Sequence, residues 1–159
     1  MNELSHLDEQ GRVKMVNVAA KEATLRTARA RSIVVLPQEM MRHLEHGDIR
    51  SKKGSVFQAA VIGGIMAAKR TGELIPLCHP LGMDSCDIEI HVNDRQEVVI
   101  DCTASITAKT GIEMEAMVGA TMAALTIYDM CKAMSHDIVI KETRLIEKTG
   151  GKRDFRREE

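Results

Sequence analysis

A carboxylate and an amine stand close together late in the chain, where Asp129 and Lys132 end a stretch with no charge after Glu115. If this stretch is a helix, residues three positions apart share one face. The pair is then either a surface ion pair or an acid–base pair in a pocket, where burial lowers the pKa of a lysine and a carboxylate orients it or passes it protons. The spacing alone leaves both interpretations open.

A basic segment, Lys52-Lys53-Gly54-Ser55, directly precedes an apolar run. If that run is a helix, its free N–H groups and the positive end of its dipole suit a phosphate, and a neighbouring lysine adds charge. An ordinary basic turn before a helix is the simpler interpretation. The frame of a P-loop is missing.

Two prolines, Pro76 and Pro80, bracket Leu77-Cys78-His79 and stiffen that segment. We expect a rigid loop that presents His79 to a ligand, with a structural histidine as the alternative. A zinc site is poorly supported, because adjacent Cys and His residues lack a second spaced pair.

Thr110 and Glu113 stand three positions apart before the long apolar stretch, which is the spacing of a capping box. This interpretation accounts for Glu113 but leaves Glu115 unexplained.

The elements that must position these residues follow from local patterns. The β-branched run from Ser32 to Val35 indicates a strand, and the alternation from Cys86 to Val92 indicates a half-buried one. Pro37 suits the first turn of a helix. In chain order we predict a strand from Thr24 to Leu36, a short helix from Gln38 to Glu45 closed by Gly47, a helix from Ser55 to Lys69, a strand from Met83 to Val92, its hairpin partner from Glu97 to Thr107, a long helix from Ile112 to Met134 and a last strand from Asp137 to Ile146.

The order β-α-β-β-α-β predicts an α+β, ferredoxin-like fold, an antiparallel sheet with helices packed on one face. The 159 residues suit a single domain, 1–159, with a flexible tail from about residue 149. Gly63-Gly64 and many alanines allow close helix packing. The helices have little polar surface. We therefore expect part of their apolar surface to contact another subunit, and not only the chain's own core.

Composition excludes several classes of function. The net charge is -1, and the chain has two Phe, one Tyr and no Trp, which argues against a nucleic-acid partner. The longest uncharged run, Gly54 to Ala68, is shorter than the ~20 residues of a membrane helix. The N-terminus lacks a secretory pattern and none of the four cysteines forms C-x-x-C, so we expect reduced thiols in a cytoplasmic protein.

Together these segments closely resemble the cyclic pyranopterin monophosphate synthase family, in order and over nearly the whole chain. The motifs are long and unusual. They are Met15-Val16-Asn17-Val18 with Lys21, Thr24, Arg26 and Ala28, then Lys53-Gly54, Ala67 to Thr71, Leu74 to Leu81, Thr110 to Ala116, Leu125 to Ala133 and Lys148 to Lys152.

The resemblance implies a lyase of molybdenum cofactor (molybdopterin) biosynthesis. Its substrate would be 3′,8-cyclo-7,8-dihydroguanosine triphosphate, a small molecule derived from GTP, and its products cyclic pyranopterin monophosphate and pyrophosphate. It also implies a homohexamer made of three dimers, with the active site at the dimer interface. No organic cofactor and no bound metal are expected, although magnesium can accompany the substrate triphosphate.

The resemblance also implies roles for single residues. Asp129, Lys53 and Lys132 match the acid–base set, and cations suit a reaction that expels pyrophosphate. The expected substrate-binding residues are Leu77, Cys78, His79, Glu113, Met114, Glu115, Arg26, Lys148 and Lys152. A non-catalytic pterin- or nucleotide-binding module of the same fold is the alternative, and retention of the acid–base set argues against it.

The chain departs from the family pattern in three places. Most members have Asp where Asn17 and Ser55 stand, and many have Ser-Gly where this chain has Arg153-Asp154. Losing Asp at the first two positions removes negative charge near the expected phosphate site or the subunit contact. With Asp129 and both lysines present, we expect activity.

Overall fold

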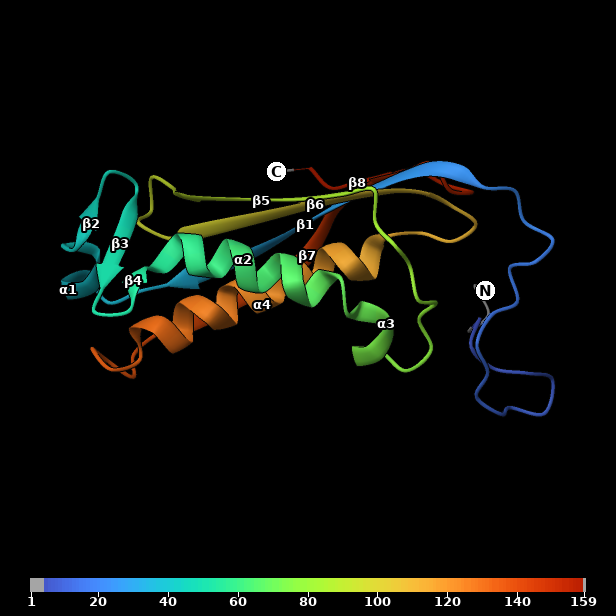
Figure 1. Ribbon diagram of the computed structural model, residues 1–159, viewed down its shortest axis with the longest axis horizontal. Helices are drawn as coiled ribbons and strands as arrows, with labels where there is room; N and C mark the ends of the chain where they lie inside the picture. Colours follow the sequence, from blue (N-terminus) through green and yellow to red (C-terminus); the bar gives the residue numbers. More distant parts are fainter. Residues whose placement is uncertain (1–4, 159) are drawn as a thin grey trace.

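The computed structural model describes residues 5–158 and has two helices packed on one face of an antiparallel sheet (Figure 1). The six expected main elements are confirmed in type and order. They are strand β1 (Thr24–Val35), helix α2 (Val56–Ala68), strands β5 (Ser85–Val92) and β6 (Val98–Ala108), helix α4 (Glu113–Cys131) and strand β7 (Val139–Thr149).

The main sheet has the order β5-β6-β1-β7-β8, and all neighbouring strands are antiparallel. β1 and β5 are separated by β6, which is the split βαβ arrangement of the ferredoxin-like fold. The register pairs Thr24 with Ala108 and Val34 with Val98. The N-terminal ends of β1 and α4 therefore lie at one end of the molecule, and the C-terminal end of α4 lies at the other.

Helices α2 and α4 pack closely because glycines stand at their contact. A Cβ added to Gly64 would lie 2.7 Å from the carbonyl oxygen of Gly119 on α4. The buried positions of α4 recur every three or four residues, as the helical repeat requires. They include Ala116, Gly119, Ala120, Ala123, Ala124, Ile127 and Cys131.

The expected helix from Gln38 to Glu45 is wrong beyond its first turn. Helix α1 spans only Gln38–Met41, and a second, three-stranded sheet follows it. His46 and Gly47 both have positive φ, so they form a tight hairpin that ends any helix. The small sheet consists of β2 (Leu44–Glu45), β3 (Asp48–Ser51) and β4 (Gly54–Ser55).

Two further short elements lie outside the predicted set. Helix α3 (Thr71–Leu74) follows α2 and leads into the Pro76–Pro80 segment. Strand β8 (Phe155–Arg156) pairs with β7 after a turn at Gly150, which has φ of +86°. The chain beyond residue 149 thus folds back onto the edge of the main sheet.

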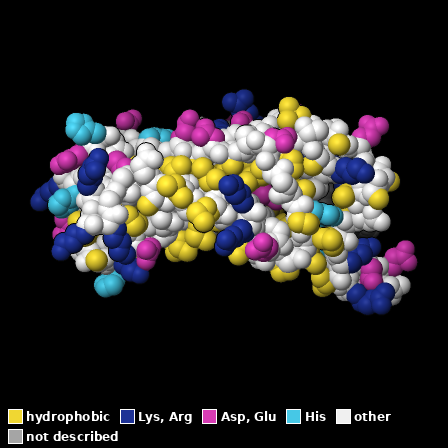
Figure 2. All heavy atoms as spheres, viewed as in Figure 1, with side chains coloured by type: hydrophobic (Ala, Val, Ile, Leu, Met, Phe, Trp, Pro, Cys, Tyr) yellow, Lys and Arg dark blue, Asp and Glu magenta, His cyan; other side chains and the backbone are white. Residues whose placement is uncertain are grey.

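Hydrophobic side chains remain exposed on the outer faces of the helices. Ile62 and Met66 on α2 are 59% and 52% exposed, and Leu125 on α4 is 48% exposed. Figure 2 shows hydrophobic atoms gathered across the middle of the molecule, over these two helices. No helix within residues 5–158 is long and apolar enough to cross a membrane.

Candidate functional site

The expected acid–base residues gather at the C-terminal end of α4. Lys132 Nζ lies 2.7 Å from Asp129 Oδ1, so the prediction that these side chains share a helix face is confirmed. Lys53 lies in the β3–β4 turn, where Ser51 Oγ accepts a hydrogen bond from its backbone N–H at 3.0 Å. The same hydroxyl donates to the Gly54 carbonyl at 3.2 Å, which fixes the turn.

The charges of this group act on one another. The hydrogen bond from Lys132 lowers the pKa of Asp129, and the charges of Lys132 and then Lys53 lower it further. The hydrogen bond to Asp129 and its charge raise the pKa of Lys132. Both side chains are more than half exposed, at 56% and 53%. In one chain, therefore, Asp129 keeps Lys132 in its protonated form, and burial does not make the amine neutral.

The N-terminus of α2 is occupied by side chains of the protein. Ser55 Oγ accepts a hydrogen bond from Gln58 N at 3.1 Å, and Asp48 Oδ1 accepts one from Phe57 N at 2.8 Å. The Ser55 hydroxyl also donates to Asp48 Oδ2. A carboxylate thus lies where an anion would bind, and Lys53 belongs to an ordinary turn before the helix.

Nearly all of the expected substrate-binding residues lie around the opposite end of α4. A cavity of about 400 Å³ is lined by the rigid segment after α3 and by the first turn of α4. His79 Nε2 lies 2.7 Å from the carbonyl oxygen of Val16, which can only accept. Nε2 therefore carries a proton, which leaves Nδ1 as an acceptor. The expected residues on this cavity are Leu77, Cys78, His79, Glu113, Met114, Glu115 and Lys148.

Burial raises the pKa of two ionisable groups in this cavity. Glu115 is 3% exposed, and burial followed by the charge of Glu113 raises its pKa. Burial, and then the charge of Glu115, raises the pKa of the Cys78 thiol. A protonated thiol is a poor metal ligand. Within residues 5–158, no group of three or more His, Cys, Asp and Glu side chains is placed to hold a metal ion.

The expected capping box at the start of α4 is wrong. Ile112 occupies the N-cap position, and no side chain caps the helix there. The carboxylate of Glu113 instead bonds Lys148 Nζ on β7 at 2.8 Å. A long-range ion pair has replaced the local hydrogen bond that the Thr110–Glu113 spacing suggested.

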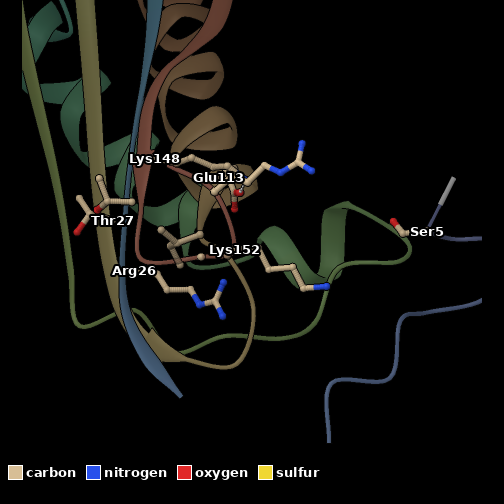
Figure 3. A pocket seen from close by; sticks show the side chains of 11 residues that line it. Ser5, Arg26, Thr27, Glu113, Lys148 and Lys152 are labelled. Carbon is tan, nitrogen blue, oxygen red and sulfur yellow. Dashed lines mark hydrogen bonds and ion pairs between the residues drawn. The ribbon is translucent and has the colours of Figure 1, made fainter. Parts of the chain in front are cut away.

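A second cavity, of about 550 Å³, adjoins the first at the Glu113–Lys148 pair. Figure 3 shows this pair with Arg26 and Lys152 beside it. Arg26 Nε donates to the Ala108 carbonyl at 3.2 Å, which holds the guanidinium at the cavity wall. The cavity therefore gathers cations from β1, β7 and the loop after β7.

The site residues thus form two groups in one chain, which we call the acid–base group (Lys53, Asp129, Lys132) and the cation pocket (the two adjoining cavities). Glu113 and Asp129 mark the two groups on α4 and are 16 positions apart, or about 24 Å at the helical rise. One chain alone does not bring the two groups together.

Sequence reasoning missed several residues that shape these groups. Ser51 fixes the turn that carries Lys53, Asp48 accepts from Phe57 N at the start of α2, and Arg153 lines the larger cavity. The His46-Gly47 dipeptide is a hairpin signal that could have revealed the small sheet. The loop that carries Arg153 is held between β7 and β8. Strand β8 has only two residues, so its sequence shows no periodic pattern from which it could be predicted.

Asn17 and Ser55, which stand where the family resemblance led us to expect Asp, both make local hydrogen bonds through oxygen acceptors. Asn17 Oδ1 accepts from Ala19 N at 2.9 Å, and Ser55 caps α2. Asp48 supplies a carboxylate beside Ser55. Asn17 and Ser55 thus each supply a hydrogen-bond acceptor to a nearby backbone N–H group.

Comparison with known proteins shows what the chain is similar to. A Xanthomonas oryzae protein named cyclic pyranopterin monophosphate synthase is 50% identical over 152 residues, covering 96% of this chain and 92% of that protein. A Dictyostelium discoideum protein named molybdenum cofactor biosynthesis protein 1 is 46% identical over 168 residues, covering 95% of this chain but 27% of that protein.

A Synechocystis protein named molybdenum cofactor biosynthesis bifunctional protein is 47% identical over 154 residues, covering 94% of this chain and 44% of that protein. The chain thus spans nearly all of the Xanthomonas relative and less than half of the other two. The profile described as MoaC family matches residues 15–151. Since this match covers most of the chain, the chain belongs to the MoaC family.

Proposed function

We propose that this protein is a lyase that converts 3′,8-cyclo-7,8-dihydroguanosine triphosphate to cyclic pyranopterin monophosphate and pyrophosphate, in molybdenum cofactor biosynthesis. The full-length similarity to proteins named for this synthase supports the proposal. The observation that carries it is the presence of both the acid–base group and the cation pocket in a chain that is 50% identical to a protein named for this synthase.

The cation pocket suits the polyphosphate end of such a substrate. Arg26, Lys148 and Lys152 place three cations around one cavity, and His79 offers Nδ1 in the adjoining one. A departing pyrophosphate carries several negative charges, and preorganised cations stabilise that charge as it develops. Leu77, Met114 and the buried Glu115 would contact the ring system.

The acid–base group suits the ring opening and closing. Asp129 is held as a carboxylate and Lys132 as an ammonium, so the pair offers a proton acceptor and a proton donor within 2.7 Å. Lys53 adds a second positive charge close enough to act on Asp129. Opening and rebuilding the rings requires protons to be taken from and returned to nitrogen and oxygen atoms.

The site is assembled from two protomers in this proposal. The two groups are about 24 Å apart along α4, and exposed hydrophobic side chains lie between them on α2 and α4. An interface related by a two-fold axis pairs the same face with itself in opposite directions. The acid–base group of one protomer then meets the cation pocket of its partner. Three such dimers would make the expected homohexamer.

The reaction would need no organic cofactor, and magnesium would enter only with the triphosphate. A cytoplasmic location fits a substrate derived from GTP. Turnover by protein treated with EDTA, with and without added magnesium, tests the metal requirement. Unchanged turnover without magnesium would mean that the lysines and Arg26 alone carry the phosphate charge.

Turnover of the cyclised GTP intermediate tests the proposal. Purified protein should release pyrophosphate and form the pyranopterin together. Asp129→Ala and Lys53→Ala should abolish both products while leaving the oligomer intact, whereas Lys52→Ala, in the same turn, should remain active. Tight binding without pyrophosphate release by the unaltered protein would instead support a non-catalytic binding module.

A further inference from the structure

The loop between β7 and β8 places an arginine, Arg153, on the larger cavity of the cation pocket. The lining residues of this cavity include four cations, Arg26, Lys148, Lys152 and Arg153, and one carboxylate, Glu113. An excess of positive charge around a cavity of about 550 Å³ suits a ligand with several negative charges. The loop residues that face this cavity therefore bear on which anions it accepts.

The loop follows a fixed course. Thr24 Oγ1 on β1 donates to the Gly150 carbonyl at 2.7 Å, and Gly150 N donates to Asp154 Oδ1 at 3.2 Å. Only glycine fits at position 150, because φ is +86° and a Cβ would overlap the backbone of Leu25. Strand β8 then ties the chain back to β7. The loop is therefore already ordered without a ligand, so ligand binding does not include the entropy cost of ordering it.

Arg153 makes fewer hydrogen bonds and ion pairs within the protein than two neighbouring cations, Lys148 and Arg26. Lys148 is paired with Glu113 at 2.8 Å, and Arg26 donates to backbone carbonyls at positions 108 and 109. Within residues 5–158, Arg153 makes no hydrogen bond or ion pair, and its side chain is exposed. Its guanidinium retains the planar set of donors that binds two phosphate oxygens at once.

We propose that Arg153 is a specificity-determining residue that binds the outer phosphates of the substrate's polyphosphate group. This role rests on the proposed function. A monophosphate lacks the outer two phosphates, so a guanidinium that binds them favours triphosphates over monophosphates. The Asp154 side chain, which accepts from Gly150 N at 3.2 Å, helps to hold the loop that carries Arg153 in place.

Titration calorimetry with inorganic tripolyphosphate, at fixed ionic strength, tests the role of Arg153 directly. Arg153→Ser should weaken tripolyphosphate binding by about tenfold, the loss typical of one charge-assisted bidentate contact, and should affect orthophosphate much less. Arg153→Lys should recover only part of the affinity, because an ammonium lacks the planar fork. Arg95→Ser, in the β5–β6 turn at the other end of the sheet, makes the same change in net charge and should bind as the unaltered protein does.

Turnover separates this proposal from the proposed function. Arg153→Ser should raise KM for the cyclised triphosphate with a smaller change in kcat, and circular dichroism should confirm that the variant is folded. If the unaltered protein turns over and Arg153→Ser matches it in KM and in tripolyphosphate affinity, the role of Arg153 is refuted and the function stands. If tripolyphosphate binding depends on Arg153 but no product forms with the unaltered protein, the function fails and the anion site stands.

Discussion

The crossing of α2 and α4 is held by Gly64, and replacing this glycine should cost stability. A Cβ at position 64 would overlap the end of the Ile88 side chain and would lie 2.7 Å from the Gly119 carbonyl oxygen. The Ile88 side chain can shift, but the Gly119 oxygen belongs to helical backbone and cannot rotate away. Overpacking of this kind costs roughly 1–3 kcal/mol, and replacing a helical glycine by alanine returns about 1 kcal/mol. We therefore expect Gly64→Ala to destabilise the protein by up to about 2 kcal/mol.

Gly63→Ala is the matched control for this substitution. Its Cβ would meet Thr126 Oγ1 at 2.7 Å, a side-chain atom that can shift only by loosening its hydrogen bond to the Met122 carbonyl. That loss should offset the gain in helix propensity of about 1 kcal/mol, so Gly63→Ala should be about as stable as the unaltered protein. Urea unfolding at one protein concentration measures both variants. Equal stability of Gly63→Ala and Gly64→Ala would refute the argument that backbone contact sets the helix crossing.

The remaining predictions concern Ser55, Cys86 and Glu115. Ser55→Asp places a second carboxylate against Asp48 and should lower stability by roughly 1–2 kcal/mol in thermal unfolding, with Asp48→Asn restoring it. The hydrogen bond from Cys102 lowers the pKa of Cys86, so mass spectrometry should find Cys86 alkylated by iodoacetamide before the other cysteines. Burial raises the pKa of Glu115 in the folded protein. As pH rises, Glu115 therefore loses its proton in the unfolded chain before it does so in the folded one. Stability should fall from about pH 4.5 up to that raised pKa, and Glu115→Gln should lessen the fall.

The main fold could be predicted because its signals are local. Alternation in β5, the β-branched run in β1 and the long uncharged stretch of α4 each report on a single element. The small sheet escaped prediction because strands of two to four residues show no period. The helix predicted over residues 38–45 ends at Met41, because Leu44–Glu45 pairs with β3 through the tight turn at His46 and Gly47.

The site could be predicted only where its contacts are local. The shared face of Asp129 and Lys132 followed from helical spacing. The pairing of Glu113 with Lys148, 35 positions away, did not, because non-local contacts depend on the register of β7. The gathering of Arg26, Lys148 and Lys152 near Glu113, away from Asp129, likewise depends on non-local contacts.

Subunit complementation tests the central claim, that one site is built from two protomers. Asp129→Ala inactivates the acid–base group and Lys148→Ala inactivates the cation pocket, so each variant alone should be inactive. After subunit exchange, half of the dimers are hybrids, and each hybrid has one intact site of two, which predicts about a quarter of full activity. A mixture that stays inactive, although native mass spectrometry confirms the hybrids, would contradict the account.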